Sequence, residues 1–230
     1  MNDFRLLIAI VRRDQGKAYR EFLVHSGAKR VMASLCNGTA SKSMLDYLGI
    51  EKTEKLMLKT MLSARTARRL QRQLIEVMGI DVPGNGISMT IPVGSIGGVS
   101  SMQYLVSGQE IEQEEVKKVS EYPYALIITI ADKGNVDIIM DAARSAGARG
   151  GTVIAARGTG AEMQARFFGI SIGEEKEIFY IVAKKAEKAA IMQAIMAKAG
   201  PNSEAHGVLF SLPVDSIAGL RSVAEHEEEA

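Results

Sequence analysis

Two glycine-rich stretches in the second half of the chain carry residue types suited to holding a negatively charged group. The first is the run Arg157-Gly158-Thr159-Gly160, and the second extends from Gly200 to Gly207 and includes His206. Glycine lets backbone N–H groups approach an anion closely and form a concavity around it. Arg221, further along, could add a bidentate charge-assisted contact. The pattern predicts an anion-binding site, although the same glycines also suit a tight turn.

The chain also repeats itself. The run Leu6 to Ile10 recurs as Leu126 to Ile130, Gly27-Ala28 recurs as Gly147-Ala148, and the spacing drifts by one residue further along, as a small loop insertion would cause. An ordered series of matches with the glycines in step indicates two copies of one folding unit. A functional site is therefore expected in both copies, in one copy alone, or built from residues of both.

Composition restricts the classes of function. The chain has 230 residues, 47% of them hydrophobic, with 28 Lys and Arg against 27 Asp and Glu and a net charge of +1. This balance gives no long-range field for nucleic acid or an anionic membrane. The single cysteine, Cys36, excludes an intrachain disulfide and is typical of a reducing cytoplasm. The N-terminus does not resemble a signal peptide, and no apolar run approaches the roughly 20 residues that span a bilayer. We therefore expect a cytoplasmic protein without membrane insertion.

Apolar periodicity predicts the same order of elements in both copies. The first copy has predicted strands at 4–11, 30–35, 55–61 and 87–92 and predicted helices at 15–26 and 64–78. The second has predicted strands at 124–131, 152–155, 178–182 and 208–212 and predicted helices at 134–146 and 186–199. The residues expected to face inward are Val136, Ile139, Met140 and Ala143 in the first helix of that copy and Ala190, Ile191, Ala194, Ile195 and Ala197 in the second.

The order β-α-β-β-α-β predicts an α+β fold made of two tandem ferredoxin-like repeats. Each repeat would have an antiparallel four-stranded sheet with both helices on one face, because right-handed crossovers place them on the same side. We expect the first repeat over residues 1–98, a charged connector over 99–123, the second repeat over 124–221 and an acidic tail over 222–230.

The strands are apolar on both faces, as Ile8, Ile10, Ile128, Ile130 and Ile154 illustrate. At about 25 cal/mol per Å² of apolar surface, a wet sheet face would forfeit many kcal/mol. The two copies packed sheet to sheet, or a larger assembly, would cover these faces. We therefore predict a homo-oligomer.

The second copy resembles PII-type signalling proteins, the nitrogen regulatory protein P-II superfamily. Residues 147–153 read Gly-x-x-Gly-x-Thr-Val and are followed, after four residues, by the Gly-x-Gly of 158–160, which is the family's pattern. The resemblance covers nearly all of 124–221, and residues 5–98 share it more weakly through their likeness to the second copy.

The resemblance implies a trimer-like ring of ferredoxin-like units that binds adenine nucleotides (ATP, ADP or AMP) in clefts between neighbouring repeats. One unit would supply the Thr and the Gly-x-Gly, its neighbour would supply the second loop and a basic residue, and a mobile loop (160–177) would engage a target protein. The implied ligand-binding residues are Thr152 for the base or sugar, Arg157, Gly158, Thr159 and Gly160 along the phosphates, His206 and Gly207 in the second loop, and Arg221 as the cap on the charge.

The chain departs from the family pattern at several of these positions. Val208 and Gly219 stand where the family has cations, which removes charge-assisted contacts to a triphosphate. In the first copy, Met32 stands where the second has Thr152, and Ala40 stands where it has Gly160. We therefore expect a degenerate first repeat that acts as scaffold and a second repeat that contacts the ligand.

The sequence thus predicts a non-enzymatic PII-like regulatory protein that senses a small anionic metabolite and passes its state to a partner protein. No catalytic triad, metal-ligand cluster or Walker loop is visible, and no resident cofactor is expected. Two alternatives stay open. One is a small-molecule enzyme that uses Asp132, Glu162 or His206 as a titratable group, and the other is an assembly protein without a ligand.

Overall fold

The computed structural model describes residues 4–39, 54–94, 105–106, 109, 121–157, 166–167, 170–171 and 175–219. The chain forms two compact units. The first unit comprises Met1–Leu35, Glu54–Tyr124 and Pro213–Ala230, and the second comprises Cys36–Thr53 and Ala125–Leu212.

The compact units differ from the predicted domains 1–98 and 124–221 because two segments cross over. The segment Cys36–Thr53 belongs to the second unit, and Pro213–Ala230 belongs to the first. Backbone pairing explains both exchanges. Gly38 pairs with Thr152 of the second unit, whereas Ala218 pairs with Ser88 of the first.

The first unit contains the predicted βαββαβ elements and one further strand. Its elements are β1 (Phe4–Arg12), α1 (Gly16–His25), the first part of β2 (Met32–Gly38), β3 (Glu54–Ser63), α3 (Ala64–Glu76), β4 (Gly86–Pro92) and β11 (Ser216–Ala218). The strands lie in the order β2-β3-β1-β4-β11. The central strand β1 is antiparallel to both β3 and β4, with Leu7 opposite Thr60 on one side and Thr90 on the other.

Both helices of the first unit pack on one face of its sheet. Leu7, Ala9 and Val11 alternate along β1 and are buried in one cluster with Leu23 of α1 and Leu70 of α3. This alternation is the two-residue period of a strand that offers one face to a helical layer. The hydroxyl of Ser63 caps α3 by accepting from Thr66 N at 3.3 Å.

The second unit repeats this plan. Its elements are β5 (Tyr124–Asp132), α5 (Val136–Ser145), β6 (Thr152–Arg157), β9 (Glu175–Lys184), α6 (Lys185–Ala199) and β10 (Val208–Val214). The last two residues of β10 belong to the first unit. The short strands β7 (Arg166–Phe167) and β8 (Ile170–Ser171) form a separate two-stranded sheet. The strands lie in the order β10-β5-β9-β6. Numbered by their place in the repeat, they are the fourth, first, third and second strands. The first unit has the same order when its strands are read from β4, as β4-β1-β3-β2.

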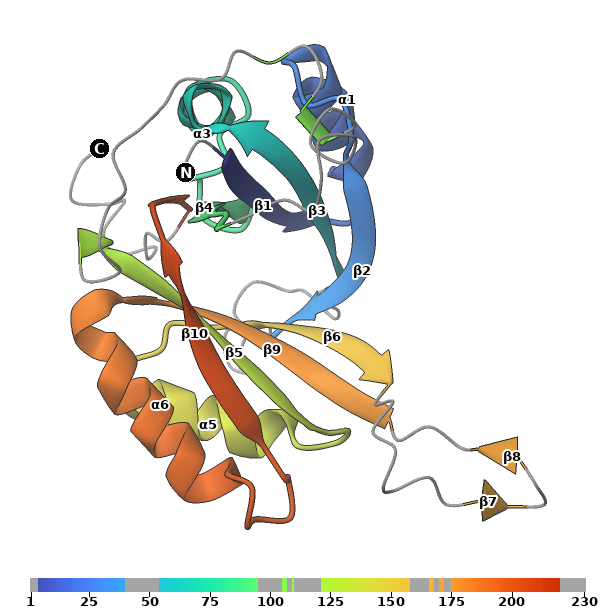
Figure 1. Ribbon diagram of the computed structural model, residues 1–230, viewed down its shortest axis with the longest axis vertical. Coiled ribbons are helices and arrows are strands. Elements are labelled where there is room, and N and C mark those ends of the chain that lie inside the picture. Colours follow the sequence, from blue (N-terminus) through green and yellow to red (C-terminus); the bar gives the residue numbers. More distant parts are fainter. Residues whose placement is uncertain are drawn as a thin grey trace. The chain divides into compact units, whose positions relative to one another are not determined.

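Helices α5 and α6 lie side by side on one face of the strands of the second unit (Figure 1). The predicted inward residues of α5 are confirmed, since Ile139, Met140 and Ala143 are buried and Val136 packs against them. In α6 the prediction is correct for Ile191 and Ile195. It is wrong for Ala190 and Ala197, which are exposed, because the inward row continues to Ala199 instead.

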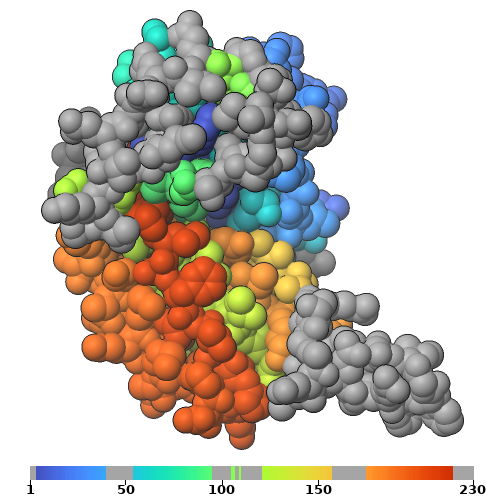
Figure 2. Space-filling view, in the orientation of Figure 1, coloured from blue at the N-terminus to red at the C-terminus, as the bar shows by residue number. Residues whose placement is uncertain are grey.

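The predicted α+β class, with helices on one face of an antiparallel sheet, is confirmed. On the face of β1 away from its helices, Ile8 and Ile10 are buried within the single chain, as is Ile128 of β5. Val208 and Phe210 of β10 are 56% and 44% exposed, and the red β10 segment reaches the surface in Figure 2. No helix in the described part of the chain is long and apolar enough to cross a membrane.

Candidate functional site

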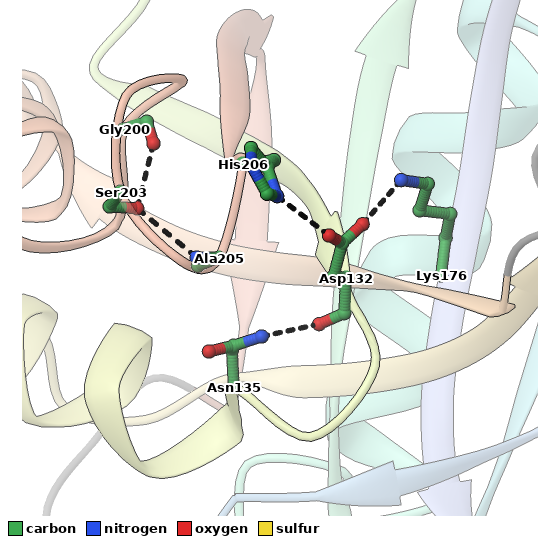
Figure 3. A network of polar contacts seen from close by, with 7 residues as sticks. All are labelled: Asp132, Asn135, Lys176, Gly200, Ser203, Ala205 and His206. Carbon is green, nitrogen blue, oxygen red and sulfur yellow. Dashed lines mark hydrogen bonds and ion pairs between the residues drawn. The ribbon is translucent and has the colours of Figure 1, made fainter. Parts of the chain in front are cut away.

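A cluster of charged side chains gathers around Asp132, the last residue of β5 (Figure 3). Its Oδ2 lies 2.8 Å from Nδ1 of His206, and its Oδ1 accepts a hydrogen bond from Nζ of Lys176. The three residues come from β5, β9 and the loop between α6 and β10, so this end of the second unit's sheet brings them together. Asp132 and His206 are thus placed in direct contact.

Backbone hydrogen bonds fix the position of the carboxylate. Asp132 N donates to Ala205 O at 3.0 Å, which ties the end of β5 to the α6–β10 loop. Asn135 Nδ2 donates to Asp132 O at 2.9 Å and closes the turn that leads into α5. Gly134, with φ at 97°, supplies the left-handed residue of that turn.

The α6–β10 loop, residues 200–207, is a compact turn held by Ser203. Ser203 Oγ donates to Gly200 O at 2.7 Å and accepts from Ala205 N at 3.2 Å, while His206 N donates to Ser203 O at 3.1 Å. His206 has φ at 44°, a left-handed conformation that is uncommon outside glycine and that costs free energy. The pair with Asp132 helps to hold it there.

Glycine is required at the end of this loop by close packing. A Cβ atom at Gly207 would lie 2.0 Å from Ala199 O, the carbonyl to which Gly207 N donates at 3.0 Å. The backbone therefore approaches the last turn of α6 more closely than any side chain allows. The loop is a structural unit as well as a candidate site.

The local charges determine the protonation state of the cluster. The hydrogen bond from Lys176 is the main cause that holds the pKa of Asp132 below its usual value, with a further contribution from His206, while desolvation opposes them. Lys133, the residue after Asp132, forms an ion pair with Glu175, with 2.8 Å between Nζ and Oε2. The hydrogen bond within this pair raises the pKa of Lys133. At neutral pH the cluster therefore holds a carboxylate clamped by an ammonium group.

The strand β6 brings Arg157 to the same end of the sheet. In the β6–β9 register Ala156 lies opposite Lys176 and Arg157 lies opposite Glu175. Three of the predicted ligand residues, Arg157 by its backbone and His206 and Gly207, thus belong to one end of the second unit. The predicted residues Gly158, Thr159, Gly160 and Arg221, and Glu162 of the enzyme alternative, lie outside the described residues.

Thr152 lies at the opposite end of β6. It pairs with Tyr180 on one side and with Gly38 on the other, five residues from Arg157, or roughly 17 Å along an extended strand. The residue is only 7% exposed. Within one unit, Thr152 and the α6–β10 loop therefore do not meet.

A second polar cluster surrounds this end of β6. Thr39 Oγ1 donates to Gly151 O at 2.9 Å and accepts from Gly151 N at 2.8 Å, and Arg144 Nη2 donates to Thr39 O. Sequence reasoning missed Lys176, Thr39 and Arg144. Among these three, only Lys176 carried a signal in the sequence, as a charge two residues before the predicted strand 178–182. No local pattern links Thr39 to Gly151.

The arrangement around Asp132 can bind an anion or move a proton. His206 uses Nδ1 for Asp132 and its side chain is 63% exposed, so Nε2 is the nitrogen left for a ligand. An anion that displaced Asp132 would gain the ammonium of Lys176 as well. In the described part of the chain, no three His, Cys, Asp or Glu residues are placed to hold a metal ion.

Comparison with known proteins finds a family match in the second half of the chain. Residues 124–224 match the family model described as nitrogen regulatory protein P-II. This part of the chain is therefore similar to the P-II family, as its motif predicted.

Among solved structures, the chain is similar to PII from Arabidopsis thaliana bound to citrate. The two share 21% sequence identity, the match covers 43% of this chain and 81% of the other, and the TM-score is 0.34. No curated protein matches.

Proposed function

We propose that this protein is a PII-like regulator that senses a small anionic metabolite of the adenine-nucleotide class and relays its state to a partner protein. The observation that carries the proposal is the P-II match over residues 124–224, within which Arg157, His206 and Gly207 belong to one end of a single sheet. The basic side chains and close-approaching backbone at this end have the chemistry that a phosphate group requires.

Binding would act by population shift. A phosphate near His206 competes with the Asp132 carboxylate for Lys176 and His206, so the ligand changes the ion pairs that tie the α6–β10 loop to β5 and β9. The relay is the segment 160–177, most of which lies outside the described residues. Thr152 would contact the base or sugar of a nucleotide held by a neighbouring unit.

The finer features of this proposal follow from the repeat. The two units are proposed as copies of one ferredoxin-like module, of which the second contacts the ligand and the first is scaffold. Three chains would form a ring, as the PII resemblance implies, and the protein would work in the cytoplasm without catalysis and without a resident cofactor.

A thermal-shift screen tests ligand sensing. ATP, ADP, AMP and cyclic dinucleotides are added at millimolar concentration, and a ligand that binds the folded state raises the melting temperature by mass action. We expect at least one nucleotide to stabilise the protein, and Lys176→Ala and His206→Ala to weaken that stabilisation. Lys185→Ala, at the start of α6, is the matched control and should leave it unchanged. If calorimetry detects no binding of any of these nucleotides, nucleotide sensing is wrong.

The contact between Asp132 and His206 favours one second candidate, a small-molecule enzyme. A carboxylate that holds one nitrogen of an exposed imidazole orients the ring for general acid–base catalysis. Asp132→Asn distinguishes the two functions. Catalysis predicts a lost turnover with retained ligand affinity, whereas sensing predicts a changed affinity and no turnover in either protein.

A further inference from the structure

The strand β10 forms an open edge of the second unit's sheet. Among the described strands, β10 lies beside β5 and has no strand on its other side. Natural proteins protect such edges with charged residues, with proline or with very short strands. The strand β11, at the other end of the strand order, has only three residues and is protected by its length. β10 has seven residues, none of them charged, and its one proline, Pro213, is next to its end.

The first unit shows what an edge at this place in the repeat can hold. The repeat spacing makes residues 209–211 of β10 equivalent to residues 88–90 of β4. In β4 this stretch pairs on its outer side with β11, in an antiparallel ladder that is centred on Met89 and Ile217. The fourth strand of the repeat is therefore able to accept an antiparallel strand along this edge.

Burial differs between the covered and the open stretch. Met89, at the centre of the covered stretch, is fully buried, whereas Phe210 at the equivalent position is 44% exposed. Val208 is also exposed, and the red β10 segment lies at the surface in Figure 2. Leu209 packs against the core on the helix side, so the two-residue period of a strand places Val208, Phe210 and Leu212 on the opposite face. A row of three apolar side chains thus borders the open edge.

We propose that β10 pairs with β10 of a second copy of this chain, in an antiparallel ladder about a two-fold axis at Phe210. A two-fold contact joins the same patch of both subunits, so the patch must complement itself. β10 meets this condition, because Val208 then lies opposite the partner's Leu212 and the two phenylalanines lie opposite each other. Both faces of the ladder are free of charge, since Leu209 lies opposite the partner's Ser211.

A second copy fits this edge better than a peptide of another protein does. Peptides that add a strand to a sheet are selected by pockets for their alternate side chains. The groove of about 440 Å³ between α5 and α6 includes no residue of β10, and β10 has no charge to match that of a peptide. Aromatic pairs across two antiparallel strands are stabilising, which favours the self-pairing at Phe210. This interface goes beyond the proposed function and uses none of its ligand residues.

Disulfide cross-linking of the full-length chain tests the pairing and its register. In Phe210→Cys the two new thiols face each other across the axis, with about 5 Å between their Cα atoms, which suits a disulfide. We expect mild oxidation to convert most of this variant to a covalent dimer. The wild-type protein, whose cysteine Cys36 is buried, should stay uncross-linked under the same conditions.

Val208→Cys is the matched control. Position 208 is 56% exposed, so random collisions would cross-link it at least as readily as position 210. In the proposed register the two copies of position 208 are offset along the strands by about 14 Å, which is too far for a disulfide. We expect little dimer from Val208→Cys alone and a dimer when it is mixed with Leu212→Cys. Equal cross-linking at positions 208 and 210, or none at 210, overturns the proposal.

Sedimentation velocity of the protein without cross-links gives an independent measurement. Phe210→Lys places like charges opposite each other across the axis, which is destabilising, and should halve the number of chains per particle. Met196→Lys, at a 47% exposed residue of α6, is the control and should leave the number unchanged. A wild-type particle with the mass of the Phe210→Lys particle overturns the proposal and assigns the edge to another occupant. Nucleotide binding in the thermal-shift screen should survive Phe210→Lys, so a failed interface and failed ligand sensing can be told apart.

Discussion

Thr39 and Gly151, which are 112 residues apart in the chain, are joined by three hydrogen bonds. The Thr39 hydroxyl both donates to Gly151 O and accepts from Gly151 N, and Thr39 N donates to the same carbonyl at 3.0 Å. The bonds continue the pairing of Gly38 with Thr152. The end of β2 thus completes the sheet edge next to a predicted ligand residue.

Replacing Thr39 by Val should destabilise the second unit. The substitution keeps the shape of the side chain but leaves Gly151 N without its partner, at a cost of about 1–3 kcal/mol in the free energy of unfolding. Urea denaturation measures the change. Thr39→Ser keeps the hydroxyl and should cost less. Equal losses in both variants would show that the methyl group, not the hydrogen bonds, matters.

Gly207→Ala should strongly destabilise the α6–β10 loop. The new Cβ would lie 2.0 Å from Ala199 O, so α6 or β10 must shift, at a cost of about 3 kcal/mol. Gly150→Ala is the matched control, because no atom lies within 4 Å of a Cβ placed there and its φ is not left-handed. Thermal denaturation compares the two. A Gly207 variant as stable as the Gly150 variant would contradict the observed packing.

Asp215→Asn should destabilise the first unit by breaking an ion pair with a buried arginine. Arg5 Nε lies 3.1 Å from Asp215 Oδ2, and the arginine side chain is 4% exposed. Removing the carboxylate charge weakens the pairing of the buried guanidinium, whose Nη1 also donates to Phe4 O at 3.1 Å, and we expect a cost of about 3 kcal/mol in the free energy of unfolding. Asp137→Asn, on the exposed side of α5, is the control and should change little. The two variants are compared by urea denaturation at neutral pH.

The cluster at Asp132 predicts a pH dependence at the acidic end. The pKa of Asp132 is lower in the folded state than in the unfolded state. Its ionised carboxylate therefore contributes fully to the free energy of unfolding above the unfolded pKa of about 3.9. This contribution is lost as the pH falls through the folded pKa. Asp132 is 33% exposed, so solvent screening reduces the contribution.

Lys176→Gln removes the main cause of the lowered pKa, and the pKa of Asp132 should rise toward its usual value. A carbon-13 NMR titration of the Asp132 carboxyl measures the shift. Lys133→Gln is the control, because Lys133 pairs with Glu175 and should leave the pKa of Asp132 where it is. A pKa of Asp132 that stays low without Lys176 would assign the effect to another group.

Local pattern was enough to predict most of the elements. The apolar run at 4–11 predicted a strand, and the helical spacing of Ile139, Met140 and Ala143 predicted the inward face of a helix; the structure confirms both. The strand β11 was not predicted, because three residues after Pro213-Val214 carry no period of their own. Its partner β4 lies in the other half of the sequence.

The candidate site was predictable only in part. Asp132 and His206 were recognised as chemically suitable residues, but their contact depends on how two loops close against each other, through Asp132 N and Ala205 O. Lys176 joins them because the β6–β9 register brings the start of β9 to this end. The exchange of Cys36–Thr53 between units was beyond prediction, since a strand's edge partner is selected by the finished sheet and not by neighbouring residues.

The pairing of β11 with β4 has a consequence for biosynthesis. Ser216 lies opposite Thr90, and Arg5 near the N-terminus is bound by Asp215. During translation the segment that contains Asp215 and β11 must therefore leave the ribosome before the first unit can complete its sheet. Until then the edge of β4 that pairs with β11 is open to pairing with other nascent chains, so β11 also protects the newborn protein from aggregation.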